Sequence, residues 1–162
     1  VTPRCRGALL VVLLVAGPLR AQAQPGWSLA QAAKNRFADL WDASVADRRE
    51  YVACLGGWLE GDTVHVTDLL PLEVAQADSL TAEAQASIEL CGPPDWIGTV
   101  HTHIRSTDDD RPSGFFSPSD RAVMSAWVAR WRQQGAFCLL HSDQAAKCEV
   151  YPPGIPLRPR RE

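Results

Sequence analysis

The strongest structural signal in the sequence is a strand that is followed, across an acidic loop, by a capped helix. The run "DWIGTVHTHI", residues 95–104, is largely apolar and lies between turn-forming residues, which predicts a strand. The run "SPSDRAVMSAWVARWRQQG", residues 117–135, begins with an N-cap serine and a proline, and Gly135 is expected to end the helix. An apolar stripe on this helix predicts that it packs against the sheet that contains the strand.

Other elements are predicted on both sides of this unit. Apolar residues at helical spacing predict a helix that starts at Ser28, with that serine as its cap. A hairpin is expected from two extended runs, Tyr51–Leu59 and Thr63–Leu70. Residues 73–94 show no clear period, and we expect a loop there with at most one helical turn.

Two more strands are expected near the C-terminus, over "AFCLLH" and "KCEVYP". The order is helix, hairpin, strand, helix, hairpin. It predicts the α/β class, with a single mixed β-sheet flanked by helices.

The first 23 residues are typical of a secretory signal peptide. Arg4 and Arg6 precede a short apolar run, and Ala-Gln-Ala at 21–23 forms a small-x-small cleavage site. We expect cleavage after this tripeptide and export to the periplasm or the exterior, which N-terminal mass analysis of exported protein would detect. A retained membrane anchor is the alternative, although the apolar run is short for a bilayer. No stable membrane insertion is expected after cleavage.

The charge balance excludes one class of partner. Cleavage removes three of the 16 basic residues and none of the 19 acidic ones, which leaves 13 against 19 and a net charge of −6. Nucleic acid is therefore not expected as a partner, because phosphate contacts need clustered Lys and Arg. We expect an N-terminal helix over 24–47, a main domain over 48–152 and a Pro-rich basic tail over 153–162.

The mature chain keeps an even number of cysteines, which are Cys54, Cys91, Cys138 and Cys148. They allow three disulfide pairings. The C-terminal hairpin favours Cys138 with Cys148, which leaves Cys54 for Cys91, and four buried free thiols are the alternative. No Cys-x-x-Cys spacing is present, so a cysteine zinc site is not expected.

The two histidines of the strand "DWIGTVHTHI" are candidate metal ligands. His101 and His103 point to one face, because side chains alternate along a strand. Asp120, in the first turn of the next helix, lies on the apolar side that faces the sheet. Two imidazoles and one carboxylate are a ligand set that zinc accepts in catalytic sites. Each feature alone has a structural explanation, since Ser117 and Asp120 also form a capping box.

These residues resemble the pattern of the JAMM (MPN+, JAB-domain) zinc metalloproteases. "EYVACLGG" supplies Glu50 ahead of Gly57, "HTH" supplies the two histidines, and "SPSD" supplies Ser117 and Asp120. The match covers residues 48–152, nearly all of the expected domain. It departs from the family in two places. Ile104 replaces the usual proline, and the loop over residues 104–116 is longer than usual.

The resemblance implies a JAMM/MPN-like, cytidine-deaminase-like sandwich that holds one Zn²⁺. It also implies a metallopeptidase or isopeptidase that hydrolyses an amide bond with a metal-activated water. Glu50 would be the general base, Ser117 would stabilise the oxyanion, and the substrate would be a peptide or protein. The long loop is expected to border the cleft.

Two other readings of the sequence remain open. One is a catalytically silent MPN-type scaffold that binds a partner. The other is an exported binding domain stabilised by disulfides.

Overall fold

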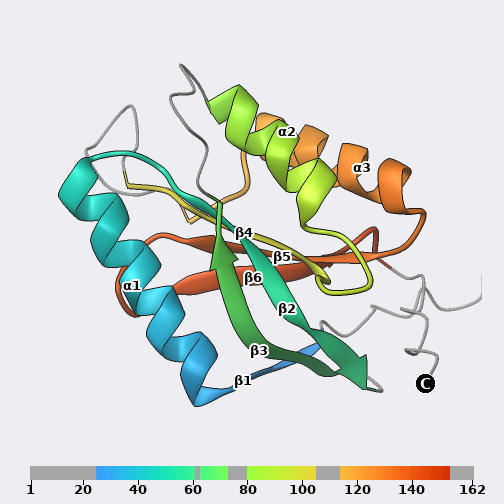
Figure 1. Ribbon diagram of the computed structural model, residues 1–162, viewed down its shortest axis with the longest axis horizontal. Coiled ribbons are helices and arrows are strands. Elements are labelled where there is room, and N and C mark those ends of the chain that lie inside the picture. The colour runs from blue at the N-terminus through green and yellow to red at the C-terminus, as the bar shows by residue number, and fades with distance from the viewer. Residues whose placement is uncertain (1–24, 61–62, 73–79, 105–113, 154–162) are drawn as a thin grey trace, which may run out of the picture.

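The computed structural model describes residues 25–60, 63–72, 80–104 and 114–153, apart from the side chains of residues 80–82. The predicted signal peptide, residues 105–113 of the acidic loop and the end of the tail lie outside these ranges. Within them the chain is a mixed α/β structure, in which helices lie on both faces of one sheet (Figure 1). The expected class, a single mixed sheet flanked by helices, is confirmed.

Six strands form the sheet in the order β1-β3-β2-β4-β5-β6. The pairs β1–β3 and β4–β5 are parallel, whereas β2–β3, β2–β4 and β5–β6 are antiparallel. Both predicted hairpins are therefore present. The strands are β1 (Gly26–Leu29), β2 (Val52–Glu60), β3 (Thr63–Pro71), β4 (Gly98–Thr102), β5 (Gly135–Leu140) and β6 (Ala146–Tyr151).

The helix α1 (Gln31–Asp47) covers one face of the sheet (Figure 1). It buries Ala33, Phe37 and Leu40 against apolar side chains of β2, β3 and β4, including Leu55 and Val100. This packing places the C-terminal end of α1 beside the start of β2. That junction contains Glu50.

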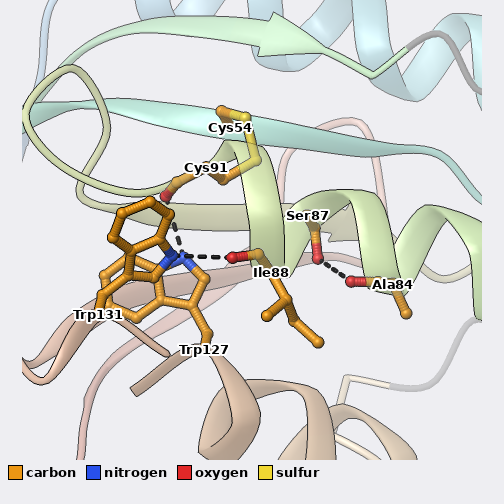
Figure 2. Close-up of a disulfide and its surroundings, with 7 residues drawn as sticks. All are labelled: Cys54, Ala84, Ser87, Ile88, Cys91, Trp127 and Trp131. Carbon is orange, nitrogen blue, oxygen red and sulfur yellow. Dashed lines mark hydrogen bonds between the residues drawn. A yellow bond between two sulfur atoms is a disulfide. The ribbon is translucent and has the colours of Figure 1, made fainter. Parts of the chain in front are cut away.

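The helices α2 (Leu80–Leu90) and α3 (Pro118–Trp131) lie side by side on the opposite face (Figure 1). Two indole N–H groups of α3 donate to backbone carbonyls at the end of α2, from Trp127 to Cys91 at 3.0 Å and from Trp131 to Ile88 at 2.8 Å (Figure 2). A buried indole N–H needs such an acceptor, so these bonds fix how the two helices pack.

The expectation of a loop over residues 73–94 is wrong for residues 80–90, because these form the 11-residue helix α2. Residues 73–79 of that segment lie outside the described ranges. Its sequence is rich in alanine and polar residues, so the apolar stripe is too weak to predict a helix. The helix is instead stabilised by tertiary contacts, among them the two indole bonds and the disulfide from Cys91 to Cys54 of β2 (Figure 2).

The predicted start of the first helix is also wrong. Ser28 is in β1 and does not cap a helix, while α1 has Ala30 as its N-cap with no side-chain capping bond. Pairing of β1 with β3 holds this segment extended, and the Ala30 N–H continues the pattern by donating to the Val66 carbonyl at 2.9 Å. Sheet pairing therefore overrides a local capping signal.

The helix α3 begins as predicted but ends earlier. Ser117 is its N-cap, whereas its C-cap is Arg132, in the left-handed conformation with φ 53°. Gly135 instead starts β5, and a Cβ on it would lie 2.7 Å from the Phe137 ring and 2.8 Å from the Trp127 ring. The glycine is needed for close packing and not for a helix stop.

Both favoured disulfides are present, and the alternative of four free thiols is excluded. Cys54 and Cys91 join β2 to the end of α2, with Cα atoms 4.8 Å apart. Cys138 and Cys148 are directly paired residues of β5 and β6, with Cα atoms 4.1 Å apart. No helix among the described residues is long and apolar enough to cross a bilayer.

The two disulfides should differ in their contribution to stability. Their sequence separations are 37 and 10 residues, and the longer loop restricts the unfolded chain more. Loop-closure entropy predicts about 4 kcal/mol for the first and about 3 kcal/mol for the second. Urea unfolding of the two double Cys→Ala variants measures both free energies. Cys54, Cys91 and Cys138 are buried and Cys148 is partly buried. Both double variants lose the same atoms, so each controls for the other; a larger loss for Cys138–Cys148 would contradict the expectation.

Candidate metal centre

His101 and His103 lie at the end of β4 with their ring nitrogens together. The two Nε2 atoms are 3.2 Å apart, and the rings meet edge to face with centroids at 4.9 Å. The backbone of His103 lies one residue beyond β4, yet its N–H donates to the Leu140 carbonyl of β5 at 2.8 Å. The strand geometry is thus extended far enough to hold both imidazoles on one face, as the alternation predicted.

Asp120 reaches the same point from α3. Its Oδ1 atom is 3.4 Å from Nε2 of His101, and its Oδ2 atom is 3.5 Å from Nε2 of His103. The carboxylate also completes the capping box. Its Oδ2 accepts the Ser117 N–H at 2.6 Å, and the Asp120 N–H donates to Ser117 Oγ at 3.2 Å. A carboxylate has enough lone pairs to accept the Ser117 N–H and to contact the two histidines at the same time. The helix cap and the cluster with the two histidines therefore occur together and are not alternatives.

The three side chains have the spacing that a metal ion needs. Their ligand atoms all lie within 4.8 Å of one another, and only 10–17 % of each side chain is exposed. A tetrahedral ion with bonds of about 2.0–2.1 Å places neighbouring ligand atoms about 3.3–3.4 Å apart. The two Nε2 atoms are 3.2 Å apart, and each has an Asp120 oxygen at 3.4 or 3.5 Å, close to that value, but the two contacts use different oxygens of the carboxylate. With one ligand atom from each residue the separations stay within 4.8 Å, so the group could hold a metal ion.

The electrostatics of Asp120 agree with a ligand role. Burial disfavours its ionised form, but the hydrogen bonds with His101 and His103 and with the Ser117 N–H outweigh burial and hold the pKa of Asp120 well below its usual range. The carboxylate is thus ionised at neutral pH, as a metal ligand must be.

Glu50 lies just before β2, on the side of the sheet where the histidines lie. Val52 pairs with His101, and side-chain alternation places Glu50 on the face of Val52. Burial raises the pKa of Glu50, Asp120 and Glu83 raise it further, and His103 and His101 lower it. The carboxyl group is therefore a neighbour of the cluster, partly removed from water. A raised pKa brings a carboxyl closer to the range in which it can both take up and release a proton.

The carboxyl group of Glu83 also lies near Glu50, and the sequence analysis did not predict it. Glu83 of α2 is only 6 % exposed, and its Oε1 accepts from Arg49 at 2.7 Å. Within the part of the chain that the structure describes, its Oε2 has no hydrogen-bond partner. Burial raises the pKa of Glu83, and the Arg49 guanidinium opposes the rise. The sequence held no signal for it, because its segment was expected to be mostly loop.

The start of α3 is held in place by contacts beyond the cap. Arg121 pairs with both carboxylate oxygens of Glu149 on β6, one of them at 3.0 Å, and its guanidinium lies 5.0 Å from the Phe116 ring centroid. The Phe116 ring in turn lies 5.9 Å from the ring of His101. Ser117 is next to the cluster, and its Oγ is 2.7 Å from Ser119 Oγ. The predicted catalytic serine is thus positioned mainly by the helix cap.

The structure therefore brings together the five predicted site residues, which are Glu50, His101, His103, Ser117 and Asp120. Neither models of known protein families nor curated protein sequences match this chain. A functional interpretation depends on the geometry and chemistry of these residues.

Proposed function

We propose that this protein is an exported zinc metallopeptidase or isopeptidase of the JAMM type. The single observation that supports the proposal most is a cluster of two imidazoles and one carboxylate at metal-ligand spacing, with a second, partly buried carboxyl group, that of Glu50, beside it. Zinc suits nitrogen and oxygen donors, and three protein ligands leave a position open. Ile104 and the long loop over residues 104–116 depart from the family pattern. The JAMM/MPN-like architecture is therefore part of this proposal.

In this proposal each residue has a separate role. His101, His103 and Asp120 hold the ion, which when bound supplies Lewis-acid activation of water and of the substrate carbonyl. Glu50 accepts the proton of the attacking water and passes it to the leaving amine. Ser117 Oγ accepts the Asp120 N–H and lies 2.7 Å from Ser119 Oγ. With Ser119 as the donor of that second bond, the Ser117 proton is available to donate a hydrogen bond to the substrate oxyanion.

The substrate class that we propose is a peptide or protein amide bond. Known members of the resembling family often act on ubiquitin-like tails, but an exported enzyme would meet other proteins. The two disulfides are compatible with an oxidising compartment. Together with residues 1–23 they support export to the periplasm or the exterior.

Metal analysis of the purified protein followed by a peptide-library screen tests the proposal. We expect about one zinc per chain, cleavage of some library peptides, loss of cleavage on chelation and recovery on zinc addition. Chelation should leave the fold in place, because the core and both disulfides do not involve the metal residues. Protein that binds no zinc, or that cleaves equally well after complete removal of metal, would exclude the proposal.

One rival has an observation in its favour. The two disulfides, one of them joining the sheet to the end of α2, suit an exported binding domain that needs no metal for rigidity. That reading predicts no zinc and strong destabilisation by reductant. A silent MPN-type scaffold would instead bind zinc weakly or not at all and cleave nothing. The metal analysis and the library screen separate these readings from the enzyme.

A further inference from the structure

Two hydroxyl groups that belong to no predicted motif are buried directly behind the candidate centre. Ser44 is in the last turns of α1 and Thr102 is in β4, between the two histidines. Both residues are 0 % exposed, and Ser44 Oγ lies 2.7 Å from Thr102 Oγ1. Since side chains alternate along β4, Thr102 points to the α1 face while its neighbours point to the metal face. The pair therefore connects α1 to the strand that carries the metal ligands.

The partners of these hydroxyls determine the direction of each bond. Ser44 Oγ lies 2.5 Å from the Arg49 carbonyl, which can only accept, so Ser44 uses its single proton there. Thr102 Oγ1 accepts the Tyr51 N–H at 2.8 Å. Thr102 must then donate its own proton to Ser44. The bonds run in one direction, from the Tyr51 N–H through Thr102 and Ser44 to the Arg49 carbonyl, and bonds in such a chain strengthen one another.

The two ends of this series of hydrogen bonds lie on either side of Glu50. The Arg49 carbonyl belongs to the peptide plane before the Glu50 Cα, and the Tyr51 N–H belongs to the plane after it. Fixing both planes fixes the two soft backbone dihedrals of Glu50, and with them the direction in which its Cα–Cβ bond leaves the backbone. Glu50 lies outside β2, which starts at Val52, and the nearest backbone bond of the sheet runs from the Thr102 N–H to the Tyr51 carbonyl at 3.0 Å. That bond holds the peptide plane after Tyr51, so the sheet alone does not restrain the two planes that flank the Glu50 Cα.

We infer that Ser44 and Thr102 are positioning residues that hold the Glu50 carboxylate in register with His101 and His103. The inference rests on the proposed function, because it assigns Glu50 a role in proton transfer. Thr102 also lies in the chain between the two histidines. The bond from the Tyr51 N–H to Thr102 Oγ1 therefore couples the position of Glu50 to that of the metal ligands. A displacement of about 1 Å in such a group can cost about 10²-fold in rate.

The test uses two variants of the full protein that remove the hydroxyls, Ser44→Ala and Thr102→Val. We expect kcat to fall about 10- to 100-fold in each, while KM and zinc affinity stay within about threefold of wild type. Thr102→Ser keeps the hydroxyl and should retain most of kcat. Ser87→Ala is the matched control, because Ser87 is 1 % exposed and donates to the Ala84 carbonyl of its own helix (Figure 2). It should leave kcat unchanged.

A second measurement does not depend on activity. Hydrogen exchange of the Tyr51 amide should accelerate about tenfold or more in Thr102→Val and in Ser44→Ala, but not in Ser87→Ala, because only the first two break the chain. Wild-type protein without zinc or cleavage would reject the proposed function, and the exchange result would still decide whether the hydroxyls restrain the Glu50 segment.

Three results would overturn the inference: kcat within twofold of wild type in Ser44→Ala, an equal fall in Ser87→Ala, or unchanged Tyr51 exchange. If Ser44→Ala does not fold, Ser44→Cys keeps a similar volume with only a weak donor and replaces it in both measurements.

Discussion

Glu50→Gln should lose nearly all peptidase activity and keep its zinc and its fold. Glutamine preserves the size and much of the hydrogen bonding of glutamate but cannot accept a proton near neutral pH. Removal of a general base typically lowers the rate by about 10²–10⁴-fold. Zinc content should be unchanged, because Glu50 is beside the three-ligand group and not part of it. The melting temperature should not fall, since replacing a partly buried carboxyl with a neutral amide removes the cost of desolvating a charge. Cleavage of a library-identified peptide, elemental analysis and a thermal melt measure the three quantities.

Glu60→Gln provides the matched control for this variant. Glu60 is at the other end of β2 and its side chain is 75 % exposed, so the same chemical change there should not affect the rate. A Glu50→Gln protein that cleaves the peptide at the wild-type rate would disprove the proposed mechanism even if zinc is present. Loss of zinc in the variant would instead show that Glu50 is a metal ligand.

Simultaneous replacement of His101 and His103 by alanine should abolish metal binding. Two of the three predicted ligands are lost, and one carboxylate in a helix cap does not retain zinc against a competing chelator. We expect zinc per chain to fall from about one to near zero. Bound zinc at 100 times its Kd stabilises the folded state by about 2.7 kcal/mol, so the wild-type protein should melt at a higher temperature with zinc than without it. The double variant should show no such shift.

His65→Ala is the control for the loss of an imidazole. His65 is on β3, stacks on Trp58 with ring centroids 5.0 Å apart, and lies outside the metal cluster. Its variant should keep full zinc occupancy and the zinc-dependent rise in melting temperature. Full occupancy in the double variant would mean that the metal is held elsewhere in the protein.

The sequence by itself determined the residues of the candidate centre. Alternation along a strand placed His101 and His103 on one face, and helix periodicity turned Asp120 towards the sheet. Both rules are local, since they depend only on backbone geometry within one element. The resemblance to a known motif added Glu50, which no local rule would have selected from the acidic residues.

The expectation that the long loop over residues 104–116 borders the cleft remains a prediction, because residues 105–113 lie outside the described structure. Only the tertiary structure decided the elements whose local signals are weak. Ser28 belongs to a strand because β3 offers it a partner, and α2 is helical because it packs against Trp127 and Trp131.

The surroundings of Glu50 could not have been predicted for the same reason. Glu83 approaches it from a helix that the sequence did not predict, and Ser44 meets Thr102 across 58 residues of chain. Composition shows neither contact, since serine, threonine and glutamate are common surface residues. The ligands were thus readable from the periodicity of single elements, whereas the groups that hold the base beside them come from separate elements, and only their packing around one core brings them together.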